Sequence, residues 1–327
     1  MDLKLRLFSL VCIATNLNLI YSYSCRFEDN QYVGYLCELK SNDSSGLEQH
    51  AAGKTDDDVK RVELEPFRNW DDKSPLKKST VNICQRFKNL QRIEVKYLKI
   101  EPNFLKGCRN LREIFTKSSE ISELPEDFLA DNRKLTSLRL RDNNWPTLPE
   151  NLFAHQQELV DITLTNNQIQ ILPKNIFKPA VNVKSIFLSE NSIQVLDSEL
   201  FKNLRNLELL SLSRNKITEL PKNIFSSLEN LHQIYLENNQ LTTIHSDSFG
   251  INRNLKIINL SWNKIEAFDE KLIDNTALEV LDMHQASCIK NLGINDRLDI
   301  KLMRMRMKKC FEHYQSRQGL VKLHIQP

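Results

Sequence analysis

A hexapeptide that recurs at a fixed interval constrains the fold of this chain more than any other feature. LPKNIF occurs at Leu172–Phe177 and again at Leu220–Phe225. Related hexapeptides stand in register at 148–153, 196–201 and 244–249, so that successive copies begin 24 residues apart. Asparagines keep the same interval from Asn143 to Asn263. A fixed period of this length predicts stacked structural repeats, and it favours a packing role for LPKNIF over a role as a functional peptide.

The apolar residues of each unit occupy fixed positions. In the unit that begins at Leu159, Ile162 and Leu164 alternate with polar residues, which predicts a short strand with one face buried. One unit cannot bury its own leucines, but stacked units share a continuous core. The side-chain amide of Asn167 both donates and accepts, so we expect it to satisfy backbone groups of its own turn and of the adjacent unit.

The pattern LxxLxLxxNx[IL]xxLPxxxF resembles the leucine-rich repeat of the 24-residue extracellular type. The resemblance implies an α/β leucine-rich-repeat solenoid, or horseshoe, with a parallel β-sheet on the concave face and disulfide-bonded caps. Because the unit is short, we expect turns and 3₁₀ segments on the convex face. The predicted division is a signal peptide at 1–24, an N-terminal cysteine-containing cap at 25–89, about nine repeats at 90–287, and a C-terminal cysteine-containing cap and tail at 288–327.

The N-terminus has the pattern of a secretory signal peptide. Lys4 and Arg6 precede an apolar run, and Ser22-Tyr23-Ser24 offers small residues at a cleavage site. Asn16 and Asn18 interrupt the run, which makes it too polar to span a membrane. The alternative, a buried N-terminal helix, fits this pattern less well. We therefore expect a secreted, extracellular protein without a transmembrane anchor.

Six cysteines remain beyond the predicted signal peptide, an even number that suits an oxidising compartment. They allow 15 connectivities. Pairing within each local group favours Cys25–Cys37, Cys84–Cys108 and Cys288–Cys310. No C-x-x-C spacing with a nearby histidine is present, so no metal site is expected.

The sequence contains no constellation of catalytic residues. It has no H-E-x-x-H, G-x-S-x-G or P-loop motif and only 7 glycines, so we expect neither an enzyme nor a cofactor. The net charge of +3 is small for 327 residues, and no nucleic-acid partner is expected from it.

Two features near the ends of the chain leave alternatives open. The sequons at Asn42 and Asn259 predict glycosylation, although Asn259 lies in an expected strand, where the sequon is as readily unused. The basic segment from Arg297 to Cys310 predicts a capping helix packed on the last repeat. An amphipathic helix that touches an acidic membrane or partner is the alternative.

Residues that point outward from the expected strands are the candidate binding residues, because the concave surface of a solenoid is extended and accessible. Phe187 and Tyr235 have the character of interface anchors, and the candidate set is Arg139, Arg141, Phe187, Tyr235 and Glu237. Ordinary exposed side chains are the alternative, since single exposed aromatics are common.

The N-terminal motifs add a more specific resemblance. HAAGKTDDDV at 50–59, VNICQRFKNL at 81–90 and FLKGCRNL at 104–111 resemble secreted leucine-rich-repeat proteins of insects, including the mosquito leucine-rich-repeat immune family. That family implies a scaffold that recognises an extracellular protein or a microbial-surface ligand in innate immunity. The coiled coil of its long members is missing here. A matrix or cell-adhesion protein and an inhibitor of a secreted enzyme are the alternatives.

Overall fold

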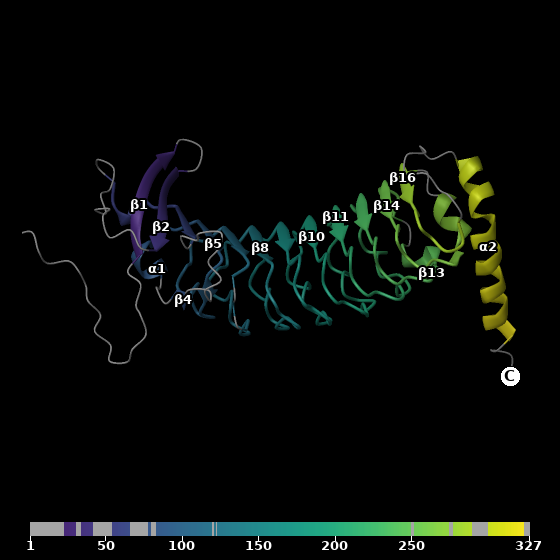
Figure 1. Ribbon diagram of the computed structural model, residues 1–327, viewed down its shortest axis with the longest axis horizontal. Coiled ribbons are helices and arrows are strands. Elements are labelled where there is room, and N and C mark those ends of the chain that lie inside the picture. The colour runs from purple at the N-terminus through teal and green to yellow at the C-terminus, as the bar shows by residue number, and fades with distance from the viewer. Residues whose placement is uncertain are drawn as a thin grey trace, which may run out of the picture.

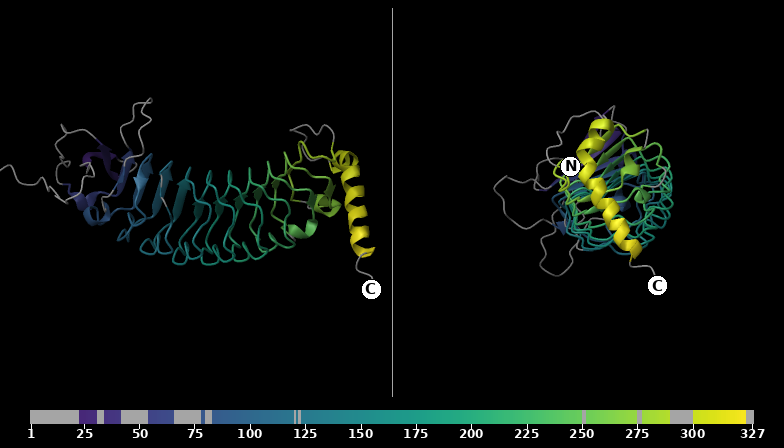
Figure 2. Two further views of the ribbon diagram at one scale, coloured as in Figure 1. Left: turned by 60° about the horizontal axis from the view of Figure 1, so that its bottom comes forward. Right: turned by 90° about the vertical axis from the view of Figure 1, so that its right-hand side faces the viewer.

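A computed structural model describes residues 23–30, 34–41, 54–65, 78–79, 83–119, 121, 123–249, 252–274, 277–289 and 300–323. The chain forms a curved solenoid in which short strands line one side and loops line the other (Figure 1). The last helix lies across the C-terminal end of the solenoid, as both views in Figure 2 show.

The described strands form one 12-stranded sheet in the order β1-β2-β3-β5-β7-β8-β9-β10-β11-β12-β14-β16. Their bounds are β1 Tyr23–Asn30, β2 Gly34–Ser41, β3 Arg61–Glu65, β5 Arg92–Lys96, β7 Glu113–Lys117, β8 Ser137–Arg141, β9 Asp161–Thr163, β10 Ser185–Phe187, β11 Leu209–Ser211, β12 Gln233–Tyr235, β14 Ile257–Asn259 and β16 Val280–Asp282. Only β1 and β2 pair antiparallel, and every other pair in this sheet is parallel. The predicted fold class is confirmed. The parallel ladder also includes β3, which lies within the region expected to form the N-terminal cap.

The return side of the solenoid consists of turns and short elements. These are two small parallel sheets, β4 Lys78–Ser79 with β6 Lys99–Ile100 and β13 Thr243–Ile244 with β15 Ala267–Phe268, the 3₁₀ segments η1 Asp56–Asp58, η2 Ser246–Ser248 and η3 Glu270–Asp274, and the short helix α1 Ile83–Arg86. The turns and 3₁₀ segments expected there are confirmed.

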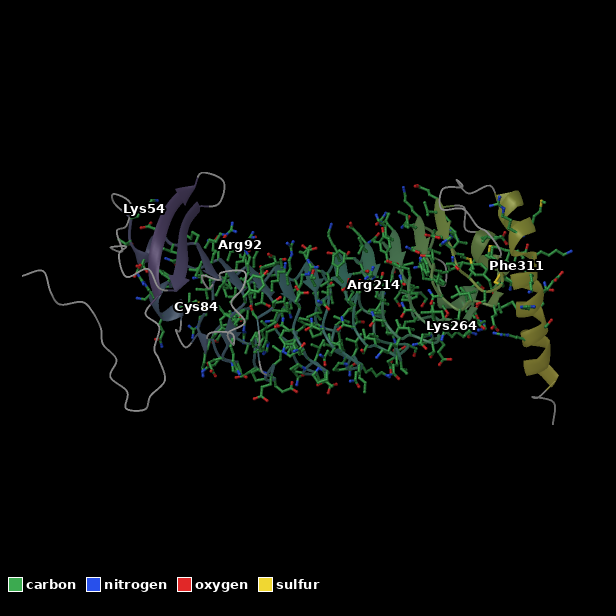
Figure 3. All side chains as sticks on the ribbon, viewed as in Figure 1. Lys54, Cys84, Arg92, Arg214, Lys264 and Phe311 are labelled. Atoms are coloured by element: carbon green, nitrogen blue, oxygen red, sulfur yellow. A yellow bond between two sulfur atoms is a disulfide. The ribbon has the colours of Figure 1, made fainter. Side chains whose placement is uncertain are left out.

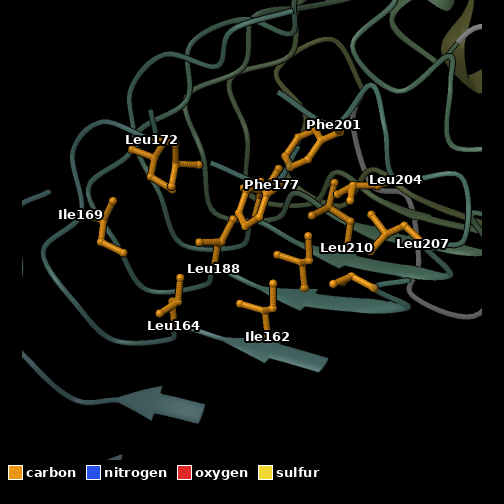
Figure 4. Packing of buried hydrophobic residues seen from close by; sticks show 14 of the residues in the cluster. Ile162, Leu164, Ile169, Leu172, Phe177, Leu188, Phe201, Leu204, Leu207 and Leu210 are labelled. Carbon is orange, nitrogen blue, oxygen red and sulfur yellow. The ribbon is translucent and has the colours of Figure 1, made fainter. Parts of the chain in front are cut away.

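The core is built from the repeating apolar positions, as Figure 4 shows for residues of successive repeats between Ile162 and Leu210. Ile162, Leu164 and their equivalents in the following repeats are fully buried. The phenylalanine that ends each hexapeptide stacks on its equivalents, with 6.0 Å between the ring centroids of Phe177 and Phe201. The hexapeptide is therefore a packing element of the core.

The buried asparagines join successive repeats. Asn215 Nδ2 donates to the carbonyl oxygens of Leu188 and Leu212, each at 3.0 Å. Its Oδ1 accepts from the backbone amide of Ile193 in the preceding repeat, at 3.0 Å. Near the start of the ladder Ser119 replaces the asparagine, and its hydroxyl donates to the carbonyl oxygens of Val95 and Lys117. The hydrogen bonding expected of this position is present.

A left-handed backbone residue precedes each of these asparagines, and nothing in the residue types predicts it. Arg214 has φ 52° and Trp262 has φ 57°, a region that bulky residues seldom occupy. Equivalent positive values recur at the same position in the neighbouring repeats, so the conformation belongs to the turn that ends each strand.

Two disulfides close the two ends of the described solenoid. Cys84 pairs with Cys108, and Cys288 pairs with Cys310, which are the pairs favoured from the sequence. The side chains of Cys25 and Cys37 lie outside the described residues, as do Asn42 and all but the last two residues of the predicted signal peptide. These features stay predictions.

The C-terminal helix α2, Ile300–Leu323, continues well beyond Cys310, where the cap was expected to close. Met307, Cys310 and Phe311 are buried on one face, and the Phe311 ring lies 6.3 Å from that of Phe268 in β15. Apolar residues at this spacing form one helical stripe, so α2 packs against the last repeats as a cap. No helix among the described segments has the length and apolar character needed to cross a membrane.

Candidate binding surface

The concave face consists of the outward-pointing side chains of the strands, and Figure 3 shows how they stand along the sheet. The parallel register places Phe187, Ser211 and Tyr235 side by side on β10, β11 and β12. Adjacent strands lie about 4.8 Å apart, so the two aromatic side chains start roughly 10 Å from each other. The serine between them leaves both rings partly accessible.

The C-terminal part of this face carries five accessible apolar side chains among polar ones. Phe187, Leu209, Tyr235 and Ile257 are half-buried, and Val280 is 45% exposed. We call these five residues the apolar patch. Tyr235 Oη donates to Gln233 Oε1 at 2.8 Å, which orients the tyrosine ring along its strand. The buried serines Ser211, Ser213 and Ser261 lie at neighbouring outward positions and form a polar floor around the patch.

The N-terminal part of the face is charged, and most of its charges are paired. Glu94 accepts from Arg61 at 3.1 Å and from Lys96 at 2.9 Å, while Arg92 donates to Glu113 at 2.9 Å. Burial acts to raise the pKa of Glu94, but the hydrogen bond and charge of Lys96, with the charges of Arg61 and Arg92, lower that pKa overall. Glu94 is therefore held as a carboxylate by the cations around it.

Three cations on the neighbouring strands have no carboxylate partner of this kind in the described structure. Lys117 of β7 and Arg139 and Arg141 of β8 are exposed, and we call them the cationic cluster. Lys117 lies directly opposite Arg141 in the parallel register. Among the residues that the structure describes, no carboxylate forms a salt bridge with any of the three. Like charges directly opposite each other destabilise a sheet.

Glu237 is an acidic group on the same face, where Asp282 of β16 is another. It follows Tyr235 by two residues and is half-buried. Its Oε2 atom is buried and has no hydrogen-bond partner in the part of the chain described. A carboxylate oxygen in that situation lacks the hydrogen bonds that normally offset its desolvation.

All five residues predicted for binding lie on the concave face, but the structure separates them into three groups. Arg139 and Arg141 belong to the cationic cluster, Phe187 and Tyr235 to the apolar patch, and Glu237 stands alone. Asn259 also lies on this face, where its Oδ1 accepts from the backbone amide of Ser261 at 3.0 Å. Its glycosylation stays a prediction.

Sequence reasoning missed several residues of this surface. Leu209, Ile257 and Val280 each precede a buried residue by one position, so strict alternation along the strand would have identified them as outward-facing. Lys117 belongs to one of the less regular repeats, in which Ser119 replaces the asparagine, so the repeat pattern marks its outward position less clearly.

A cavity of about 920 Å³ lies between α2 and the loops of the preceding repeats. Its lining includes Glu219, Lys222, His245, Lys264 and Tyr314. The Tyr314 hydroxyl lies 3.0 Å from His245 Nδ1. Burial, with the charge and hydrogen bond of Asp269 and the charge of Asp247, raises the pKa of Tyr314 to about 12. Within the described ranges, no group of three or more His, Cys, Asp or Glu side chains is arranged to hold a metal ion.

The fold resembles the solenoids of receptor and bacterial proteins. The TLR13–ssRNA13 complex matches with a TM-score of 0.58 and 19% identity over 69% of this chain and 36% of that chain. The Toll–Spatzle complex of Drosophila matches with a TM-score of 0.57 and 22% identity over 76% of this chain and 36% of that chain. A leucine-rich-repeat protein of Leptospira interrogans matches with a TM-score of 0.56 and 24% identity over 67% of this chain and 60% of that chain. The chain thus spans little more than a third of the Toll-type structures.

Family models account for most of the solenoid. The model described as a leucine rich repeat matches residues 181–241 and 229–285. The model described as a BspA type leucine rich repeat region matches residues 78–207. No curated protein sequence matches this chain. Together with the 12-stranded sheet and the repeating core, these matches show that the chain belongs to the leucine-rich-repeat proteins.

Proposed function

We propose that this protein is an extracellular recognition scaffold that binds a protein ligand on its concave face. The apolar patch carries the proposal, because it brings two aromatic and three aliphatic side chains into partial exposure on five neighbouring strands. Partly exposed aromatic anchors surrounded by polar groups are typical of protein-binding surfaces. Nothing in the core requires these residues to be apolar, since they point away from it.

The setting that we propose is innate immunity outside the cell. The two disulfides suit an oxidising compartment. The Toll–Spatzle complex is described as a hub in Drosophila development and innate immunity, and it has the same fold. The resemblance of the N-terminal motifs to mosquito immune proteins supports the same setting.

A glycan placed in the middle of the concave face would test the proposal. Ser211→Asn creates the sequon N-L-S at 211–213, between Phe187 and Tyr235. Arg205→Thr creates the sequon N-L-T at 203–205, on an exposed loop of the return side, and serves as the matched control. Both variants and the native chain would be secreted from insect cells, and mass spectrometry would verify the added glycan.

Binding would be measured against arrays of secreted and cell-surface proteins, microbial surface polysaccharides and single-stranded RNA. We expect a protein ligand that binds the native chain and the Arg205→Thr variant but not the Ser211→Asn variant. Equal binding by the glycosylated Ser211→Asn variant would show that the ligand contacts another surface, and the proposal would then be wrong. Binding only to polysaccharide or RNA would overturn the choice of a protein ligand.

A further inference from the structure

We infer that the ligand of the concave face is a polypeptide segment with an acidic end and a basic residue, separated by apolar side chains. The cationic cluster would bind the acidic end, Phe187 and Leu209 of the apolar patch the middle, and Glu237 the basic residue. The inference rests on the proposed function and specifies the chemistry of the partner at the same surface.

The cationic cluster is one pole of this surface. Elsewhere on the charged part of the face, Arg61, Arg92 and Lys96 are paired with glutamates. Lys117, Arg139 and Arg141 are the exception, although Lys117 and Arg141 face each other across adjacent strands. The repulsion between them is offset by no described carboxylate of the chain. A carboxylate from a partner would offset it and would form charge-assisted hydrogen bonds with the arginines.

Glu237 is the opposite pole. Its buried Oε2 atom has no donor in the described structure, although serine hydroxyls occupy neighbouring positions of the face. A buried acceptor without a donor is costly, and a charged acceptor more so. An ammonium or guanidinium group of a partner that contacts the accessible part of this half-buried carboxylate would offset its charge.

The spacing of the strands sets the distance between the poles. Arg141 and Glu237 occupy equivalent positions four repeats apart, with Phe187 on the strand midway between them. Four interstrand steps of about 4.8 Å place the poles roughly 19 Å apart. An extended segment covers this distance in about six residues and a helix in about thirteen.

The sign and the order of these features favour a polypeptide over a polyanion. A sulfated polysaccharide or RNA carries negative charge along its whole length. Such a polymer would have to place charge over the apolar patch and next to the unpartnered oxygen of Glu237. A polypeptide can change from acidic to apolar to basic within the available distance.

The test uses the full secreted chain and synthetic peptides. Each peptide carries two glutamates and one lysine, separated by four to fourteen residues that include a central phenylalanine and leucine. Dissociation constants would be measured by fluorescence anisotropy at low salt. We expect the tightest binding at a separation near six residues, or near thirteen for peptides that form helices.

Variants at each pole identify where the peptide binds. Binding of the tightest peptide should weaken by about tenfold or more in the double variant Arg139→Gln/Arg141→Gln. It should weaken by as much in the single variant Glu237→Gln. Replacing both arginines by glutamate should restore binding to a peptide whose glutamates are replaced by lysines. Arg205→Gln and Glu229→Gln are the matched controls, because this exposed pair at 3.7 Å lies outside the concave face. They should leave binding unchanged.

Three results would overturn the inference. One is binding that does not depend on the separation, and another is no binding by any peptide at millimolar concentration. The third is the finding that heparin or single-stranded RNA binds the cationic cluster more tightly than every peptide, with an affinity that Glu237→Gln does not change. A further outcome is a protein ligand that is blocked by the Ser211→Asn glycan and yet binds both pole variants as tightly as the native chain. In that case the inference fails while the proposed function stands.

Discussion

Lys117 and Arg141 lie directly opposite each other on neighbouring parallel strands, and no described carboxylate is paired with either. Because cross-strand like charges repel, Lys117→Gln should raise the free energy of unfolding by about 0.2–1 kcal/mol. Urea denaturation at low salt would measure the change, which should shrink at high salt as the charges are screened.

The control for that prediction is Arg92, which lies on the same face but donates to Glu113 at 2.9 Å. Arg92→Gln should lower the free energy of unfolding. If both substitutions destabilise the chain equally, Lys117 makes a favourable contact and the repulsion argument is wrong.

The asparagine ladder predicts unequal effects for two chemically identical substitutions. Asn215→Ala removes hydrogen bonds to the three buried carbonyl groups of Leu188, Leu212 and Ser213 and to one buried amide. Since each unsatisfied backbone group costs about 1–3 kcal/mol, we expect a loss of at least about 2 kcal/mol in chemical denaturation. Asn143→Ala should cost less, because Asn143 Oδ1 has no partner and Nδ2 donates to Arg141 at 2.9 Å. Equal losses would refute this account of the ladder.

The phenylalanine stack should contribute more to stability than the aromatic residues of the binding surface. Phe201 is fully buried and stacks between Phe177 and Phe225, at 6.0 and 6.1 Å. Phe201→Ala should therefore cost about 3–5 kcal/mol. Phe187→Ala removes a half-buried ring from the concave face and should cost clearly less. Thermal unfolding of the two variants would compare them, and a larger loss for Phe187→Ala would contradict the assignment.

The lowered pKa of Glu94 predicts a pH-dependent contribution to stability. The pKa lies below its ordinary value of 4.5, so the contribution is present above that value and is lost as the pH falls through the folded-state pKa. Glu94→Gln should lower the free energy of unfolding by about 1 kcal/mol at neutral pH, since solvent screens part of the network. Denaturation of the native chain and the Glu94→Gln variant from neutral to acidic pH should show a difference that shrinks once the pH falls below 4.5 and vanishes below the folded-state pKa. A difference that persists in acid would exclude an electrostatic origin.

The regular repeats made most of the fold predictable. The 24-residue interval placed Ile162, Leu164 and their equivalents in the core because each unit repeats the same local geometry. The prediction of the fold from the sequence was weaker where the units depart from the 24-residue pattern. Helix α2 extends beyond Cys310 because Phe311 and Tyr314 contact Phe268 and His245, and those partners lie in repeats that only folding brings to the helix.

By itself, the sequence determined which residues enter the core and which asparagines join the repeats, because both depend on position within a single unit. It also placed Arg139, Phe187 and Tyr235 on one face. Only the tertiary structure decided which charges on that face are paired. Glu94 pairs with Arg92 and Lys96 of its own strand and with Arg61 of the adjacent strand β3, whereas Lys117 and Arg141 meet each other. Arg61 and Arg141 reach Glu94 and Lys117 from adjacent strands, so these two pairings depend on the lateral register of the sheet and on the reach of each side chain.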